Sequence, residues 1–115
     1  MAGLSDAGKN VMLDALAGVA GFVSLHTADP GTTGASEVTG GSPAYARKAI
    51  TWAAASAGNL DGSSVTFDVP AGTYTHLGYW SAVTAGTFYG GSALSTPETF
   101  AAQGQYVLDD ADVNL

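Results

Sequence analysis

The first periodic stretch of the chain predicts a helix over residues 5–19, where apolar positions recur at three- and four-residue intervals, as in an amphipathic helix. Ser5 is a candidate N-cap, and Asp6 in the first turn suits the helix dipole. Asp6, Asn10 and Asp14 form one polar stripe. The other side comprises Leu4, Val11, Met12, Ala15, Leu16 and Val19. We expect this apolar side to pack on the chain's own sheet, with docking on a partner as the alternative.

From residue 22 onward the pattern changes to short alternating runs separated by glycine, proline and asparagine, which is typical of β-strands and turns. Val65, Phe67 and Val69 alternate with polar neighbours, as in a strand with one buried face. The predicted strands cover residues 22–27, 45–54, 64–69, 73–83 and 87–94, with one or two more within 99–108 after a break at Pro97. We therefore predict a mainly β fold, with one N-terminal helix (5–19) and an antiparallel β-sandwich or jelly-roll-like part over residues 22–115. The whole chain, 1–115, is expected to be a single domain.

The loop between the first two predicted strands is long for a chain of 115 residues. It runs from residue 28 to residue 43 and opens with the turn Asp29-Pro30-Gly31. A long loop in a small fold usually binds something or is ordered by a partner. Asp29, Pro30 and Glu37 of this loop are therefore candidate interface residues.

Aromatic residues gather in and around the hairpin predicted at residues 73–94. Large side chains on both faces of the strand at 73–83 predict a central strand that is covered on both sides. Because aromatic rings supply much of the burial in a small core, we assign to the core Trp52, Phe67, Tyr79, Trp80 and Phe88. An exposed aromatic face around Trp80, suited to sugar binding, is the alternative.

Charge changes the expected partners. Charged residues make up 11% of the chain, against about 25% in typical domains. Ten acidic residues oppose only Lys9, Arg47 and Lys48, which gives a net charge of −7. Binding to nucleic-acid phosphates or to an anionic membrane requires a basic patch, so we expect neither partner. Low charge and many small residues indicate a surface that neighbouring copies cover.

Oligomerisation is the expected source of extra stability. The chain has no cysteine, which excludes disulfides and thiolate metal sites, and small domains without such staples often rely on association. The basic pair Arg47-Lys48 is a candidate interface for acids of a neighbouring copy. The acids that we expect to meet it are Asp109, Asp110 and Asp112.

Signals for chemistry are sparse. His26 and Asp29 could form a metal or acid–base pair, but no third ligand lies near them in sequence, and a histidine at a strand end is more often hydrogen-bonded to loop backbone. Glu37 and Asp29 lack the alternating spacing of a calcium loop. The chain has no Gly-x-Ser-x-Gly elbow and no Gly-Lys-Ser or Gly-Lys-Thr phosphate loop. We predict no catalytic residue, no cofactor, no metal site and no enzyme activity.

Four segments in a fixed order carry a resemblance to a known family: LHTADPG (25–31), GGSPAYARKAITW (40–52), FDVPAGT (67–73) and GYWSAVTAGTFYG (78–90). They resemble small virion structural proteins of tailed phages, mostly phages of actinobacteria, which are described variously as capsid decoration, head-fibre or minor tail proteins. The resemblance covers nearly the whole chain.

This resemblance implies a virion protein that is made in the cytoplasm of the host bacterium. The first expectation is a capsid decoration or minor capsid protein that binds the major capsid protein from outside, as a homotrimer, and stabilises the lattice. The alternative within the family is a minor tail or tail-tip protein that contacts other tail proteins. A carbohydrate-binding receptor module and, more remotely, a hydrolase are the alternatives of other classes.

Overall fold

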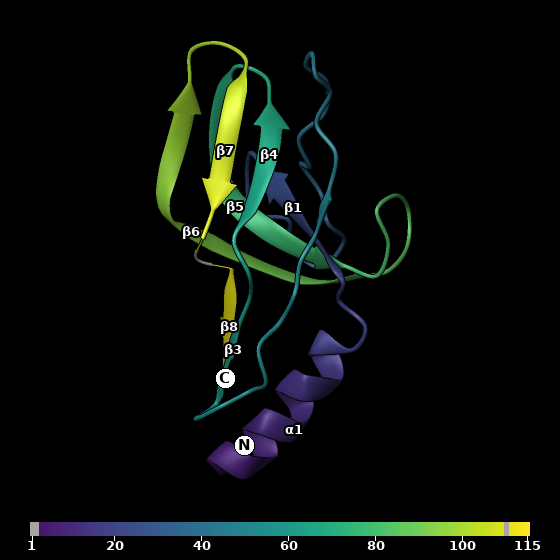
Figure 1. Cartoon of the computed structure of the whole chain (residues 1–115), viewed down its shortest axis with the longest axis vertical. Helices are drawn as coiled ribbons and strands as arrows, with labels where there is room; N and C mark the ends of the chain where they lie inside the picture. The colour runs from purple at the N-terminus through teal and green to yellow at the C-terminus, as the bar shows by residue number, and fades with distance from the viewer. Residues whose placement is uncertain (1–2, 110) are drawn as a thin grey trace.

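The computed structural model describes residues 3–109 and 111–115. It shows an elongated molecule with extents of 45 × 26 × 24 Å, in which helix α1 lies at one end and the larger sheets lie toward the other (Figure 1). In chain order the elements are α1 (Asp6–Ala17), β1 (Phe22–His26), β2 (Lys48–Ala49), β3 (Asn59–Asp61), β4 (Val65–Val69), β5 (Gly72–Trp80), β6 (Phe88–Phe100), β7 (Gly104–Leu108) and β8 (Asp112–Asn114). The prediction of a mainly β protein with one N-terminal helix is confirmed.

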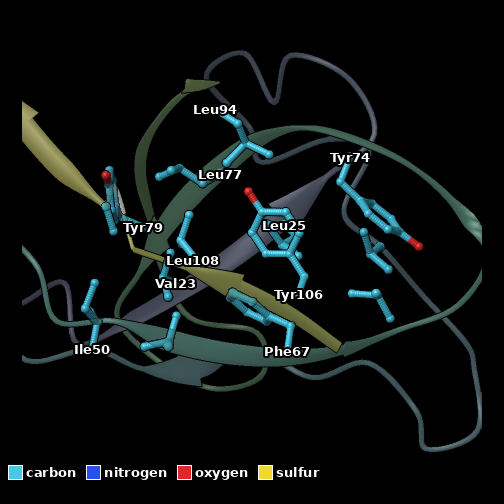
Figure 2. Close-up of a cluster of buried hydrophobic side chains, with 14 of the residues drawn as sticks. Val23, Leu25, Ile50, Phe67, Tyr74, Leu77, Tyr79, Leu94, Tyr106 and Leu108 are labelled. Carbon is cyan, nitrogen blue, oxygen red and sulfur yellow. The ribbon is translucent and has the colours of Figure 1, made fainter. Parts of the chain in front are cut away.

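The strands form antiparallel sheets whose inner faces share one core. One sheet has the order β2-β1-β5-β6, and two further pairs are β3-β8 and β4-β7. Figure 2 shows side chains of β4 and β7, among them Phe67 and Tyr106, gathered with Leu25 of β1 and Leu77 of β5. This arrangement is consistent with the predicted β-sandwich.

Helix α1 begins as predicted, because the Ser5 hydroxyl accepts a hydrogen bond of 3.2 Å from the Gly8 amide. Its polar stripe, however, turns toward the protein. Asn10 Oδ1 accepts from the Gly58 amide at 3.0 Å and Asp14 Oδ1 accepts from the Ala55 amide at 2.8 Å. These contacts satisfy loop backbone donors that would otherwise need water.

The apolar side of α1 packs inward only in part, through Leu16. Leu13 is the buried residue of the helix, and Leu16 is half-buried. The remaining large members of the predicted apolar side are exposed: Leu4, Val11, Met12 and Val19. The helix thus contacts its own protein through Leu13 and Leu16, and Asn10 and Asp14 bind loop amides beside them.

The strand predicted at 45–54 is reduced to the two residues of β2. It pairs with Phe22 and Val23 of β1, and beyond them the long loop occupies this edge of β1. Val38 donates its amide proton to the Leu25 carbonyl, and the Tyr45 hydroxyl accepts from the Leu25 amide at 3.0 Å. A side chain thus replaces a ladder hydrogen bond at this edge.

The break predicted at Pro97 is also corrected. Strand β6 runs through Pro97, because the β5–β6 register shifts between Tyr74 and His76 and the irregular stretch accommodates a residue without an amide proton. Near the C-terminus, Asp112 pairs with Asp61 in the β3–β8 ladder, and Ala111 is buried.

Candidate functional site

The loop between β1 and β2, residues 27–47 (the β1–β2 loop), is held in place by the chain itself. Asp29 is exposed, and its carboxylate accepts from the Gly31 amide at 2.8 Å, which fixes the turn. Pro30, predicted as an interface residue, is fully buried. It packs beside Gly91 of β6, where an ideal Cβ would come within 2.7 Å of the proline ring.

A buried hydrogen-bond chain connects this loop to two central strands. Trp80 Nε1 donates to Ser24 Oγ at 2.8 Å, and Ser24 Oγ lies 2.7 Å from His26 Nε2. His26 Nδ1 lies 2.7 Å from the Ala35 carbonyl oxygen. Because a carbonyl only accepts, Nδ1 carries the proton and Nε2 accepts from Ser24. The prediction that His26 bonds the loop backbone is confirmed.

This buried chain fixes the protonation state of His26. Burial lowers the pKa of His26 from 6.5, with Arg47 adding to the effect and the Ala35 carbonyl and Glu37 opposing it. Both Ser24 and His26 are completely buried. The neutral imidazole is therefore the form that the folded protein holds at neutral pH.

The lowered pKa predicts a loss of stability in mild acid. Below about pH 6.5 the unfolded chain binds a proton that folded His26 takes up only at a lower pH, so the unfolding free energy falls as pH decreases. One such proton contributes a slope of up to about 1.4 kcal/mol per pH unit. Urea unfolding between pH 5 and 7 measures this slope, and His26→Asn is expected to reduce it. Equal slopes for the two proteins would contradict the assignment.

A second cluster, here called the Arg47 clamp, consists of Glu37, Tyr45, Arg47 and Trp80. Arg47 Nε and Nη2 donate to the two carboxylate oxygens of Glu37 at 3.0 and 2.9 Å. Arg47 Nη1 donates to the carbonyls of Ala82 and Ala85 at 3.0 and 2.8 Å. Four of the five guanidinium protons are thus used within the chain.

The other two members complete the Arg47 clamp. The Arg47 guanidinium carbon lies 3.5 Å from the centre of a Trp80 ring, a cation–π contact. The Tyr45 hydroxyl donates to Glu37 at 2.9 Å, and burial raises the pKa of Tyr45. The Arg47 side chain is 8% exposed and that of Glu37 is 21% exposed. The clamp therefore joins the β1–β2 loop to the β5–β6 connection.

These contacts change the predicted interface. Arg47 and Glu37 satisfy each other, so the expected pairing of Arg47 with acids of a neighbouring copy does not fit this structure. Lys48 is half-buried in β2, whereas Asp109 and Asp112 are exposed. Asp110 lies outside the described residues. Intersubunit pairing of Lys48 with these acids stays a prediction.

The predicted core residues divide between buried and half-buried positions. Phe67, Tyr79 and Trp80 are buried. Trp52 and Phe88 are half-buried, and Trp52 Nε1 donates to the Ala20 carbonyl at 2.7 Å. Since Arg47 covers Trp80 and the Phe88 ring centre lies 5.0 Å from its ring centre, Trp80 does not provide the open face that sugar stacking requires.

The Ser24–His26 pair has the spacing of a nucleophile and its base. Both residues are completely buried, and Ser24 also accepts the Trp80 indole proton, so no substrate reaches the hydroxyl. Among the described residues, no three histidine, aspartate or glutamate side chains gather into a metal site. No described helix has the length and apolar character needed to cross a bilayer.

Sequence reasoning missed several residues that order the loop. Gln103 of the β6–β7 turn accepts from the Ser42 amide at 3.0 Å and donates to the Pro43 carbonyl at 3.1 Å. Ser24 and Tyr45 also order the loop, and the sequence pattern did not predict this role. Their partners lie far away in sequence, so no local spacing signals them.

One comparison with known proteins covers nearly the whole chain. Residues 3–115 match the model of a family described as Podophage GP4 fiber I protein gp80. No curated protein matches the chain. The matched range includes α1, the β1–β2 loop and every strand of the described residues. The chain therefore belongs to the Podophage GP4 fiber I protein gp80 family, and it is a virion-associated structural protein of a phage.

Proposed function

We propose that the protein is a fibre-associated structural subunit of the virion and acts by binding, without catalysis. The observation that carries this proposal is that the charged side chains of the β1–β2 loop are bonded within the chain. Its ionisable residues Glu37 and Arg47 bind each other, loop backbone and Trp80. A carboxylate and a guanidinium that are bonded to each other in this way stabilise the loop conformation. They are not free to transfer protons or to bind a substrate.

For the location in the virion, we place a fibre or tail position first, because the family is described by a fibre protein. Capsid decoration, with the major capsid protein as partner, is the second location. It is supported by the low fraction of charged residues, which suits a surface covered by neighbours. In both locations we propose a homotrimer that is made in the host cytoplasm. The net charge of −7 argues against nucleic-acid and membrane partners.

Labelling of particles distinguishes these locations. The chain has no cysteine, so Ala101→Cys would introduce a unique thiol. Ala101 is exposed in the β6–β7 turn, at the end of the molecule opposite α1 (Figure 1). Particles assembled with this variant and treated with maleimide-gold are expected to carry gold at the tail or its fibres. Gold over the capsid shell would favour decoration, and unlabelled particles would contradict both locations.

Glycan binding is a second candidate function. We propose Tyr89, instead of Trp80, as the residue that stacks on the sugar. Tyr89 is 42% exposed and lines a cavity of about 320 Å³ together with Asp112 and Asn114. An aromatic face beside acid and amide groups suits a sugar ring and its hydroxyls. Binding to host surface polysaccharide is expected to be lost in Tyr89→Ala and kept in Val83→Ala, an exposed control. Equal binding by both variants would remove this candidate.

A further inference from the structure

Helix α1 packs on the body through Leu13 and Leu16 and through part of its polar stripe. Two charged side chains contact the loop after β2: Asp14 Oδ1 accepts from the Ala55 amide, and Lys9 Cδ lies 3.0 Å from the position of an ideal Cβ on Gly58. The opposite side carries the exposed large apolar residues. These are Val11 (71% exposed), Met12 (53%), Leu4 (49%) and Val19 (48%).

These exposed residues form one continuous face. Positions three, four and seven apart lie on the same side of a helix, which places Leu4, Ala7, Val11 and Ala15 together, with Met12 and Val19 beside them. Exposed Asp14, three residues from Val11 and seven from Ala7, borders this set, and its carboxylate accepts from the Ala55 amide. Single exposed apolar residues are ordinary, whereas a contiguous apolar patch marks an interaction site.

We propose that this surface, the α1 outer face (Leu4, Ala7, Val11, Met12, Ala15 and Val19), is where copies of the chain meet, helix against helix, in a three-helix bundle. The inference deepens the proposed function, because it supplies the contact of the homotrimer. Copies with a net charge of −7 repel one another. The residues of the α1 outer face carry no charge, so copies that meet there bring few like charges together.

The shape of the α1 outer face also suits a second copy. Val11 stands between Ala7 and Ala15, with Gly8 next to Ala7, so a prominent side chain alternates with shallow positions on one surface. Identical surfaces of this kind interlock, and small residues let helix axes approach to about 8 Å. A lipid surface is a poorer occupant, because membrane-binding helices carry cations along their polar side and Lys9 is turned toward Gly58.

Size and position favour three copies. The twelve residues of α1 give a helix about 18 Å long. One pair of such helices buries less than the roughly 800 Å² per partner of a stable interface. A ring of three, in which each helix touches two neighbours, buries about twice as much. Because α1 lies at one end of the molecule (Figure 1), three helices can meet there while the larger sheets extend away.

Sedimentation equilibrium of the full chain and of Val11→Glu tests the proposal. The wild type is expected to be a trimer at micromolar concentration, and Val11→Glu a monomer. Glutamate is a better helix former than valine, so the variant keeps its helical circular dichroism and its Tm in dilute solution. Val107→Glu is the matched control, because Val107 is an exposed valine (57%) on β7, and it is expected to remain a trimer. A monomeric wild type, or a trimeric Val11→Glu, would overturn the proposal.

Two further readouts identify the surface itself. In this cysteine-free chain, Val11→Cys is expected to form intersubunit disulfides on mild oxidation, and Val107→Cys is not. Added salt is expected to strengthen association, because it screens the repulsion between acidic copies. Pairing of Lys48 with a neighbour's Asp109 or Asp112 would instead be weakened by salt. Weakening by salt, or equal crosslinking at both positions, would overturn the proposal.

The outcome is separate from that of the particle experiment. A monomeric protein that labels particles overturns the bundle and leaves the virion role intact. A trimer that never associates with particles overturns the virion role and leaves the bundle intact.

Discussion

Replacing Arg47 by alanine is expected to lower the unfolding free energy by about 3–5 kcal/mol, the range for removal of one partner of a buried ion pair. The change leaves the Glu37 carboxylate without its cation and the carbonyls of Ala82 and Ala85 without a donor. It also uncovers the Trp80 ring. Urea unfolding measures the loss, and tryptophan fluorescence is expected to shift to the red as water reaches the indole.

Matched variants separate the Arg47 clamp from a general effect of charge. Lys48→Ala removes the adjacent cation and is expected to cost less than about 0.5 kcal/mol. Arg47→Lys keeps the charge but loses the two-pronged contact with Glu37, so we expect it to recover only part of the stability. When Arg47 is already alanine, the further change Glu37→Ala is expected to lower the unfolding free energy little, because the ion pair is already absent. Equal stability of Arg47→Ala and Lys48→Ala would show that the clamp does not hold the loop.

Gly34→Ala is expected to lower the unfolding free energy by about 2–4 kcal/mol, the second large effect. Gly34 has φ of 78°, where a side chain costs about 1 kcal/mol. An ideal Cβ there would lie 2.5 Å from a Trp80 ring carbon and 3.1 Å from one of Phe88. Overpacking of this kind costs about 1–3 kcal/mol. The loop must therefore move off the indole or the ring must leave its site.

Gly31→Ala is the control for Gly34→Ala, because it isolates the backbone term. Gly31 also has a positive φ, of 61°, but an ideal Cβ at this position meets nothing within 4 Å. We expect a cost of about 1 kcal/mol from the backbone alone. Urea unfolding of the two variants gives the packing term by difference. If both lost the same amount, the close contact between the loop and Trp80 would not be supported.

Local signals predicted the elements that depend on near neighbours in sequence. The N-cap at Ser5 was predicted correctly, and β4 matches the alternation of Val65, Phe67 and Val69. The strand expected at 45–54 is reduced to β2, because Leu25 of β1 bonds the Val38 amide and the Tyr45 hydroxyl in place of strand backbone. A loop side chain that hydrogen-bonds to the backbone of an edge strand produces no periodic pattern in the sequence.

In the candidate site too, contacts between sequence neighbours were predicted, and contacts between distant segments were not. The bond from His26 to loop backbone follows from a histidine at a strand end and was predicted. The stacking of Arg47 on Trp80 depends on how the β5–β6 connection meets the loop, which no spacing reveals. For α1, periodicity identifies which residues share a side. It does not identify which side turns inward, and here that side combines buried Leu13 with the polar residues that bind the amides of Ala55 and Gly58.

The most direct measurement of the structural role is the copy number of the protein in purified particles, determined by mass spectrometry against isotope-labelled standard peptides. We expect the protein to remain with the particles through density-gradient purification, in a fixed number that is a multiple of three. Loss of the protein on purification, or a copy number that varies between preparations, would contradict its assignment as a structural part of the virion.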